Sequence, residues 1–390
     1  MGEKEMSQGV NKEQITAWCE RHFEEQLALL KTLAAIPAPS HHEERRAEFI
    51  LHWLRAAGAE NAYIDPALNV VLPFACEGRD DITVYMAHTD VVFPDTDALP
   101  VREEDGLLWG PGVGDDTANV AALMLCAKFL LTEKPCQKNP ILIVFNSCEE
   151  GLGNLKGVRR IMEDFTGHVK ELVSFDGEYT SIVNRAVGSE RWRVSASTVG
   201  GHSYGAFGNP NAITHLAKLI VKLDRQSVPM KPDCKTTFNV GTIQGGTSVN
   251  TIAQSAQMTY EYRSDDKESI GIMRDQFKEL LRKADCDDAH FEAELLGERP
   301  CGDSVPKAAE EALLGRCAGI VEEFTGERPS LRSGSTDANI PLSMGVPAAT
   351  FGLYLGDGAH TREEYIEIDS LLTGLKIGLA VVVSSFCGEK

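Results

Sequence analysis

The chain has 390 residues, more than one hydrophobic core usually holds, so we expect two domains. An apolar share of 43% with 25% charged residues is ordinary for a soluble globular protein. Acidic residues outnumber basic ones by 58 to 38, and a formal net charge of -20 repels both nucleic acid backbones and anionic lipid. Composition therefore excludes nucleic acid and membranes as expected partners.

Ten cysteines are scattered from Cys19 to Cys387 without a C-x-x-C pair, which fits neither a zinc ribbon nor a compact disulfide framework. We expect free thiols in a reducing cytoplasm. The acidic start lacks the basic and apolar regions of a signal peptide, and we expect no window of membrane-spanning length. The predicted location is therefore cytoplasmic.

Near the amino end, apolar residues at helical spacing predict an amphipathic helix over residues 12–36. Ser40 and Glu43 then have the Ser-x-x-Glu spacing of a capping box, which predicts the start of a second helix. His41 and His42 are consecutive in its first turn and point in different directions, so we expect surface positions for them rather than a metal site.

Four short apolar runs each lead into a histidine or a carboxylate. The runs and the residues that follow are 81–87 with His88 and Asp90, 141–146 with Glu149 and Glu150, 171–175 with Asp176, and 348–355 with His360. Such runs are typical of parallel strands buried on both faces, and in open α/β sheets the chemistry lies beyond the carboxyl ends of the strands. One such run is compatible with a polar surface loop, but four together indicate a shared site.

A glycine-rich segment over residues 110–114 precedes Asp115, Asp116 and a helical run over 120–131. A dinucleotide-binding loop spaces its glycines differently, and two aspartates would repel a pyrophosphate at the helix N-terminus. The aspartates instead suit a cation, or they cap the helix. Both interpretations stay open at this point.

The character of the chain changes between residues 185 and 300, where strands and helices in the order β-α-β-β-α-β suit a ferredoxin-like layer. The predicted fold class is α/β, with a mixed, largely parallel sheet, helices on both faces and an inserted α+β ferredoxin-like domain. We expect residues 1–186 and 302–390 to form the first domain and residues 187–301 the insertion.

The ordered motifs resemble those of the M20 family of dinuclear metallopeptidases, over nearly the whole chain including its inserted lid domain. The motifs are His88-Thr-Asp90, the Gly-x-Gly-x-x-Asp of residues 110–115, Glu149-Glu150-Gly, Asp176-Gly and Gly358-Ala-His360-Thr. The Asp-Gly at Asp176, where many deacylases of the family carry Glu, and the doubled Asp115-Asp116 resemble the peptidase T-like aminotripeptidase branch. The resemblance implies a zinc-peptidase-like catalytic domain and a lid that also serves dimerisation.

The resemblance further implies two divalent metal ions in the catalytic domain. The implied ligands are Asp115 as a bridge, His88 and Asp176 for one ion, and Glu150 and His360 for the other. Mixed histidine and carboxylate ligands suit Zn²⁺, with Co²⁺ or Mn²⁺ as alternatives. Glu149 is implied as the general base and acid, and Asp90 as the support of His88.

In the lid, His202 resembles the family's histidine that donates to the developing oxyanion, often from the partner subunit, which implies a homodimer through the lid. Asn250 and Arg263 resemble substrate-binding residues, and Arg263 can grip a carboxylate bidentately. A turn histidine and a surface ion pair are the alternatives. Ser335 and Thr336 resemble a loop that lines the substrate pocket.

Together these features predict hydrolysis of amide bonds in short peptides, by a di- or tripeptide exopeptidase acting as an aminopeptidase. One alternative keeps the chemistry but changes the substrate to an N-acyl amino acid, as in deacylases of the acetylornithine or succinyl-diaminopimelate type. Another is a non-catalytic acidic binding protein.

Overall fold

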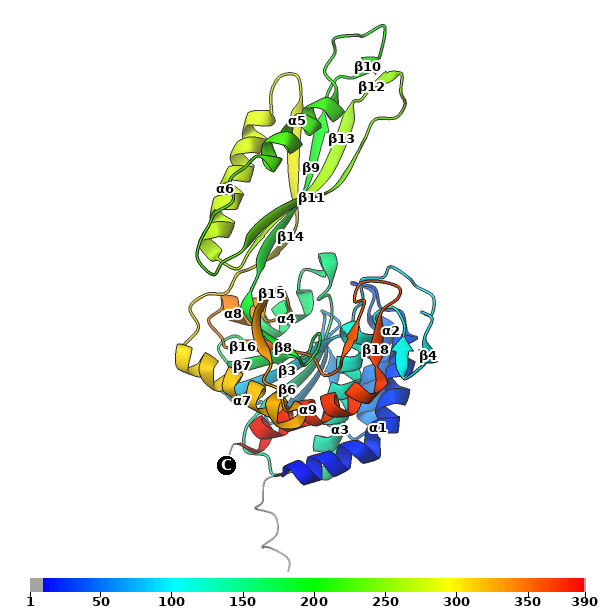
Figure 1. Ribbon diagram of the computed structural model, residues 1–390, viewed down its shortest axis with the longest axis vertical. Helices are drawn as coiled ribbons and strands as arrows, with labels where there is room; N and C mark the ends of the chain where they lie inside the picture. Colours follow the sequence, from blue (N-terminus) through cyan, green and yellow to red (C-terminus); the bar gives the residue numbers. More distant parts are fainter. Residues whose placement is uncertain (1–9, 389–390) are drawn as a thin grey trace, which may run out of the picture. The chain divides into compact units, whose positions relative to one another are not determined.

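The computed structural model describes residues 10–388 and divides the chain into two compact units, whose elements are labelled in Figure 1. Unit 1 comprises the chain up to Arg185 and from Ser304 onward, and unit 2 spans Ala186–Asp303.

The centre of unit 1 is an eight-stranded mixed sheet. Its strands are β1 (Tyr63–Ile64), β2 (Val70–Phe74), β3 (Ile82–His88), β6 (Ile141–Asn146), β7 (Val169–Ser174), β8 (Ser181–Ala186), β15 (Ser330–Gly334) and β16 (Ala348–Thr350). They lie in the order β1-β2-β6-β3-β7-β16-β8-β15, and the four from β6 to β16 run parallel. Every residue of β3 and β6 is buried, as expected for parallel strands covered on both faces. The predicted α/β fold class is confirmed.

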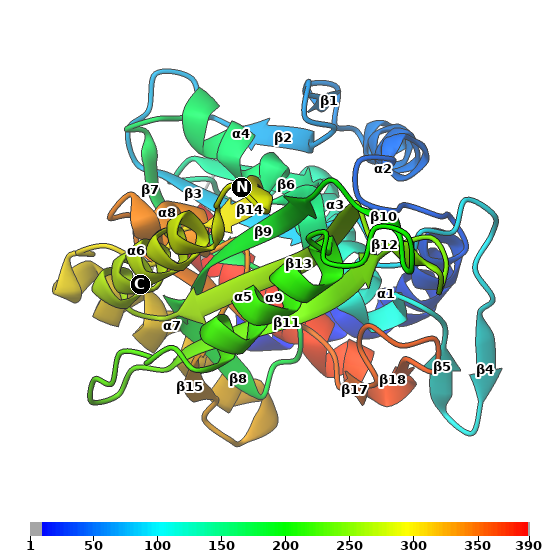
Figure 2. The same cartoon turned by 90° about the horizontal axis from the view of Figure 1, so that it is seen from above.

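Helices cover both faces of this sheet. They are α1 (Lys12–Ala34), α2 (Glu44–Ala56), α3 (Asn119–Glu133), α4 (Lys156–Asp164), α7 (Lys307–Thr325), α8 (Asn339–Ser343) and α9 (Ile368–Cys387). In Figure 2, α4 lies on one side of β3 and β6, and α9 lies on the other. The predicted first helix is confirmed as α1, which Asn11 caps through a reciprocal pair of hydrogen bonds with Gln14.

The capping box predicted at Ser40 and Glu43 is wrong. Helix α2 begins after Glu43 without any side-chain cap bond. The Ser40 hydroxyl instead donates to Asp90 Oδ2 at 2.6 Å, and Glu43 Oε1 accepts from the backbone N–H of Cys148 at 3.0 Å. Both side chains have distant partners that the local pattern cannot reveal, and buried polar groups are drawn to such partners.

Helix α9 is, by length and composition, long and apolar enough to cross a membrane, so the expectation that no window reaches such a length is wrong. Most of its residues are buried inside unit 1, where it packs against α1, α3 and α7. The core helix of a globular protein can have the same length and apolar composition. The apolar residues of α9 are therefore explained by its position in the core of unit 1.

A second, four-stranded sheet of unit 1 receives the chain just after the fourth predicted run ends at Leu355. Its strands are β4 (Arg102–Glu104), β5 (Leu107–Trp109), β17 (Gly356–Asp357) and β18 (Tyr365–Glu367). The run over residues 348–355 is not one strand, because β16 ends at Thr350. Gly352 then passes so close to the backbone of Gly177 that a Cβ at Gly352 would lie 1.3 Å from the Gly177 carbonyl oxygen. The chain leaves the central sheet there and continues into β17.

Unit 2 is an antiparallel sheet with two helices on one face. Its elements are β9 (Gly188–Ser197), β10 (Gly201–His202), α5 (Ala212–Asp224), β11 (Thr236–Gly245), β12 (Thr251–Ile252), β13 (Ser255–Ser264), α6 (Lys267–Ala284) and β14 (His290–Arg299). The main sheet has the order β11-β13-β9-β14, α5 and α6 pack on it and on each other, and β10 pairs separately with β12. This arrangement fits the predicted ferredoxin-like layer.

Candidate metal centre

Neighbouring parallel strands end at the candidate site. Strand β3 ends on His88, β6 is followed by Glu149 and Glu150, and β7 is followed by Asp176. Because β6, β3 and β7 are adjacent and parallel, their carboxyl ends lie along one edge of the sheet. The structure therefore brings these four predicted residues to one place.

An irregular turn over Val113–Ala118, in which Asp115 and Asp116 have non-helical backbone angles, presents Asp115 to the same edge. Asp115 Oδ1 lies 3.1 Å from His88 Nε2, and its Oδ2 lies 3.0 Å from His360 Nε2. His360 Nε2 also lies 3.1 Å from Glu150 Oε1. Asp115 thus stands between two histidines that are far apart in the sequence, which is the position of a bridging ligand.

Asp116 points to different partners. Its Oδ2 accepts the backbone N–H of His88 at 2.8 Å, and its Oδ1 accepts from Asn119 Nδ2 at 2.6 Å. The helix-capping alternative for the aspartates is wrong, because α3 begins after Ala118 without any side-chain cap bond. Asp116 also falls in a group with His88 and Asp176 whose ligand atoms all lie within 4.8 Å of one another. The only sequence feature that pointed to Asp116 is the adjacent pair Asp115-Asp116, which suits a cation.

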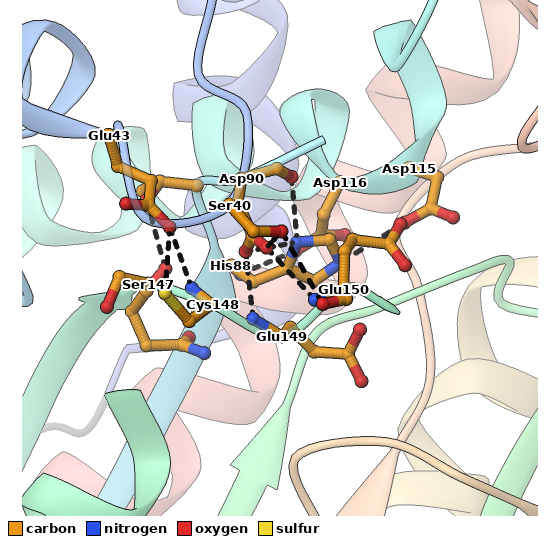
Figure 3. A network of polar contacts seen from close by, with 12 residues as sticks. Ser40, Glu43, His88, Asp90, Asp115, Asp116, Ser147, Cys148, Glu149 and Glu150 are labelled. Carbon is orange, nitrogen blue, oxygen red and sulfur yellow. Dashed lines mark hydrogen bonds and ion pairs between the residues drawn. The ribbon is translucent and has the colours of Figure 1, made fainter. Parts of the chain in front are cut away.

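Asp90 holds the two glutamates in place (Figure 3). Its Oδ1 and Oδ2 each accept a 2.9 Å hydrogen bond, from the backbone N–H of Glu149 and of Glu150 respectively. The Asp90 carboxylate also lies 3.4 Å from His88 Nδ1, whose closer neighbour is the Asp90 carbonyl oxygen at 3.1 Å. Asp90 therefore supports His88 as predicted from its position, and its larger structural role is to clamp the loop after β6.

Glu364 is a site residue that sequence reasoning missed. This buried carboxylate accepts three backbone N–H groups at 2.8 Å each, from Gly112, Gly114 and Asp115. It fixes the turn that presents Asp115. Only the loop between β17 and β18 brings Glu364 to this turn, and its sequence context, two adjacent glutamates, carries no signal for such a role.

The predicted pocket loop lies near the same edge. Thr336 is buried, with its hydroxyl 2.9 Å from that of Thr350, and Ser335 is half-buried. Asp337, the next residue, accepts from Asn146 Nδ2 at 2.7 Å, while its buried Oδ1 has no hydrogen-bond partner among residues 10–388. Asp337 is thus a buried acid within this predicted loop.

The predicted lid residues lie in unit 2. His202 and Asn250 are exposed and belong to neighbouring segments, because β10 pairs with β12 and Ser203 N donates to the Asn250 carbonyl oxygen at 3.0 Å. Arg263 is engaged by Glu261 on the same strand, through two hydrogen bonds of 3.1 and 3.0 Å. The ion pair with Glu261 matches the alternative that the sequence left open for Arg263, a surface ion pair.

The model of the peptidase family M20/M25/M40 matches residues 84–384, most of the chain. The chain belongs to the M20 family. The resemblance seen in the sequence is confirmed, and the protein is a hydrolase of this family.

Relatives of this M20 protein include both deacylases and peptidases. A succinyl-diaminopimelate desuccinylase of Corynebacterium glutamicum is 25% identical over 351 residues, covering 88% of this chain and 92% of its own. The aminopeptidase PepT of Bacillus cereus has a similar structure, with a TM-score of 0.71 at 20% identity over 93% of this chain and 98% of that one. A dinuclear metal binding M20 peptidase of Bacillus subtilis, YXEP, matches with a TM-score of 0.62 at 15% identity, over 94% and 99% of the two chains. At these identities the structures establish the fold.

The M20 family uses a dinuclear metal centre, and the donor set of this chain fits one. Two further groups of three lie within 4.8 Å, one of His88, Glu149 and Glu150 and one of Asp115, Glu150 and His360. Within the described residues, no lysine or arginine forms an ion pair with Asp115, Glu150 or Asp176. Glu150 is buried and Asp115 and Asp176 are half-buried, and carboxylates so placed without cationic side chains need another source of positive charge, which divalent cations supply.

The pKa values of these groups reflect the same lack of cationic side chains around the carboxylates. Burial raises the pKa of Asp176 well above its usual range, and Asp115 raises it further. Burial also raises the pKa of Glu150 to about 7, although the hydrogen bond from His360 opposes the rise. Hydrogen bonds to Asp115 and Glu150 raise the pKa of His360 to about 11. Without cations, protons must take up the excess negative charge.

Proposed function

We propose that this M20 hydrolase cleaves the amide bonds of short peptides, as a di- or tripeptide exopeptidase of the peptidase T-like, aminopeptidase type. The observation that carries the proposal is the division of labour between Glu149 and Glu150. Glu150 Oε1 lies 3.1 Å from His360 Nε2, and Glu150 belongs to both ligand groups that contain a glutamate, whereas Glu149 belongs only to the group with His88 and Glu150 and is held by the same Asp90 clamp. A proton acceptor thus lies beside the residues that would hold the metals.

The residues that would hold the ions are His88, Asp115, Glu150, Asp176 and His360. When bound, two divalent ions supply Lewis-acid polarisation of a carbonyl and activation of a water. Glu149 accepts the proton of the attacking water at its carboxylate and returns it to the leaving nitrogen. Asp90 fixes the Glu149 backbone through a 2.9 Å hydrogen bond, so the base starts from a defined position.

His202 is the proposed donor to the developing oxyanion. Its Nδ1 is the acceptor for the backbone N–H groups of Tyr204 and Gly205 at 3.3 and 3.2 Å. A neutral ring that accepts at Nδ1 carries its proton on Nε2. This is the tautomer that oxyanion donation from Nε2 requires.

The peptide substrate is supported by the Asp-Gly at Asp176 and by the fold shared with an aminopeptidase. A second candidate is deacylation of an N-acyl amino acid, which the similarity to a succinyl-diaminopimelate desuccinylase favours. Both reactions break an amide bond and use the same base. Zn²⁺ as the native metal, with Co²⁺ or Mn²⁺ as alternatives, a homodimer through unit 2 and a cytoplasmic location stay predictions.

A substrate panel tests the proposal. Purified protein with added Zn²⁺, Co²⁺ or Mn²⁺ is assayed on di- and tripeptides and on N-acetyl and N-succinyl amino acids. Higher kcat/KM on the peptides supports the peptidase, and higher kcat/KM on the acylated amino acids supports the second candidate. Absence of turnover of every amide with all three metals would refute amide hydrolysis.

A further inference from the structure

A hollow of about 220 Å³ in unit 1 adjoins the candidate metal centre and holds a cation that the proposed mechanism does not use. Its wall includes Gly177, which follows Asp176, and Ala359, which precedes His360. Arg332, on strand β15, lines the same hollow. Because Gly177 and Ala359 are the sequence neighbours of Asp176 and His360, the hollow lies beside these two proposed metal ligands.

The Arg332 guanidinium is oriented but unpaired. Its Nε donates to the Ser181 hydroxyl at 2.8 Å, which anchors the group by one edge. Among residues 10–388, no carboxylate lies within ion-pair distance of Arg332. Its Nη2 lies 3.9 Å from the point that a Cβ on Gly177 would occupy, so the free nitrogens reach the segment that follows Asp176. The fork is therefore available to a ligand in the hollow.

Arg263, the arginine singled out by the sequence, is in a different situation. Both Nε and Nη2 of Arg263 bind the carboxylate of Glu261. An arginine so engaged must break two charge-assisted bonds before it can bind a substrate. Arg332 has no such bonds to break.

The acidic residues in the hollow decide which anion fits. Glu178 already accepts hydrogen bonds from Gly356 N and the Thr180 hydroxyl, both at 3.2 Å. Asp357 accepts from the Gly358 backbone N–H at 2.7 Å. These carboxylates, and that of Glu364 in the same wall, accept hydrogen bonds from other groups and do not pair with Arg332. Their charge repels a doubly charged ligand such as phosphate more strongly than a singly charged one. A single carboxylate matches the geometry of the arginine fork.

We propose that Arg332 is a specificity-determining residue that binds a carboxylate group of the substrate in this hollow, beside the metal centre. The inference rests on the proposed amide hydrolysis at the same site and names the substrate class more closely. The carboxylate belongs either to a peptide C-terminus or to an N-acyl amino acid, and both present the same group to the guanidinium.

The kinetic test compares matched substrates with and without the carboxylate. Trialanine and its C-terminal amide form one pair, and an N-acetyl amino acid and its amide form the other. We expect the wild type to favour the carboxylate in at least one pair by about tenfold or more in kcat/KM. Arg332→Gln should bring that ratio close to one, mainly through KM, and Arg332→Lys should restore part of it because it keeps the charge and loses the fork.

Arg328 offers a matched control, because it is an exposed arginine that already pairs with Glu322 at 2.9 Å. Arg328→Gln should leave the ratio unchanged. If Arg332→Gln keeps the wild-type ratio while turnover continues, the role of Arg332 is refuted and the proposed function stands.

A binding measurement separates this inference from the proposed function. Titration calorimetry of metal-loaded Glu149→Gln protein with trialanine and with N-acetylalanine should give, for at least one of the two ligands, a Kd that rises about tenfold or more when Arg332→Gln is added. The amide of N-acetylalanine should bind both proteins equally. If the wild type turns over none of the amides, the proposed function fails, yet this titration still decides the role of Arg332. Equal affinity of both proteins for trialanine and equal affinity for N-acetylalanine would together overturn the assignment.

Discussion

The carboxylate of Glu364 accepts a 2.8 Å hydrogen bond from the backbone N–H of Asp115, a residue 249 positions earlier in the chain. The same carboxylate binds the N–H groups of Gly112 and Gly114. Gly114 has no room for a side chain, because a Cβ there would lie 2.7 Å from the ring of Tyr354. The bridging position of Asp115 therefore depends on Glu364, which lies 249 positions later in the chain.

Glu364→Gln should weaken metal binding by about 10- to 100-fold, the usual cost of losing a residue that orients a metal ligand. The amide nitrogen that replaces one oxygen cannot accept an N–H, so the turn at Gly112 loses a partner. Metal affinity is measured by competition with a chromogenic chelator. The control is Glu363→Gln, an exposed neighbour that should keep wild-type affinity. Equal affinity in both variants would contradict the positioning role.

Asp90→Asn should lower kcat by about tenfold or more, because the asparagine amide group cannot accept the N–H that one carboxylate oxygen now binds. The loop with Glu149 and Glu150 would then lose one of its two backbone anchors. Steady-state kinetics and metal analysis are run together. Ser40→Ala removes one hydrogen bond from the same carboxylate and leaves both anchors, so its effect should be smaller. Asp90→Asn protein with wild-type kcat would rule out the clamp.

Glu149→Gln should keep both metals and lose two or more orders of magnitude in turnover, since a general base contributes about 10²- to 10⁴-fold. Glu150→Gln should instead lower the metal content. Metal analysis after dialysis, together with kcat, distinguishes the two variants. Wild-type turnover by Glu149→Gln protein that retains its metals would contradict the assignment of Glu149 as the general base.

Metal binding should release protons and strengthen as pH rises. In the metal-free protein, burial raises the pKa of Glu150 to about 7, and hydrogen bonds to Asp115 and Glu150 raise that of His360 to about 11. Both groups must lose a proton to become ligands, so affinity should fall as pH drops from 8 to 6. Titration calorimetry in buffers of different ionisation enthalpy counts the protons. Affinity that does not change with pH would show that these groups are already deprotonated.

Much of the fold could be predicted because local patterns specify it. The spacing of apolar residues predicts helix α1, and unbroken apolar runs predict β3, β6 and β7, since secondary structure and burial follow from neighbouring residues. The residue types just after those strands also predict a gathering at one sheet edge, because parallel strands end together. His88, Glu149, Glu150 and Asp176 are found there.

The sequence by itself determined the fold class, the family and the chemical types at the strand ends. Only the tertiary structure decided which partner each side chain has. The Ser-x-x-Glu pattern did not form a cap, because Ser40 bonds to Asp90 and Glu43 to Cys148. Glu364 reaches Asp115 only through the β17–β18 loop. Such contacts join segments tens to hundreds of residues apart, and no local pattern records which distant donor a buried acceptor will meet.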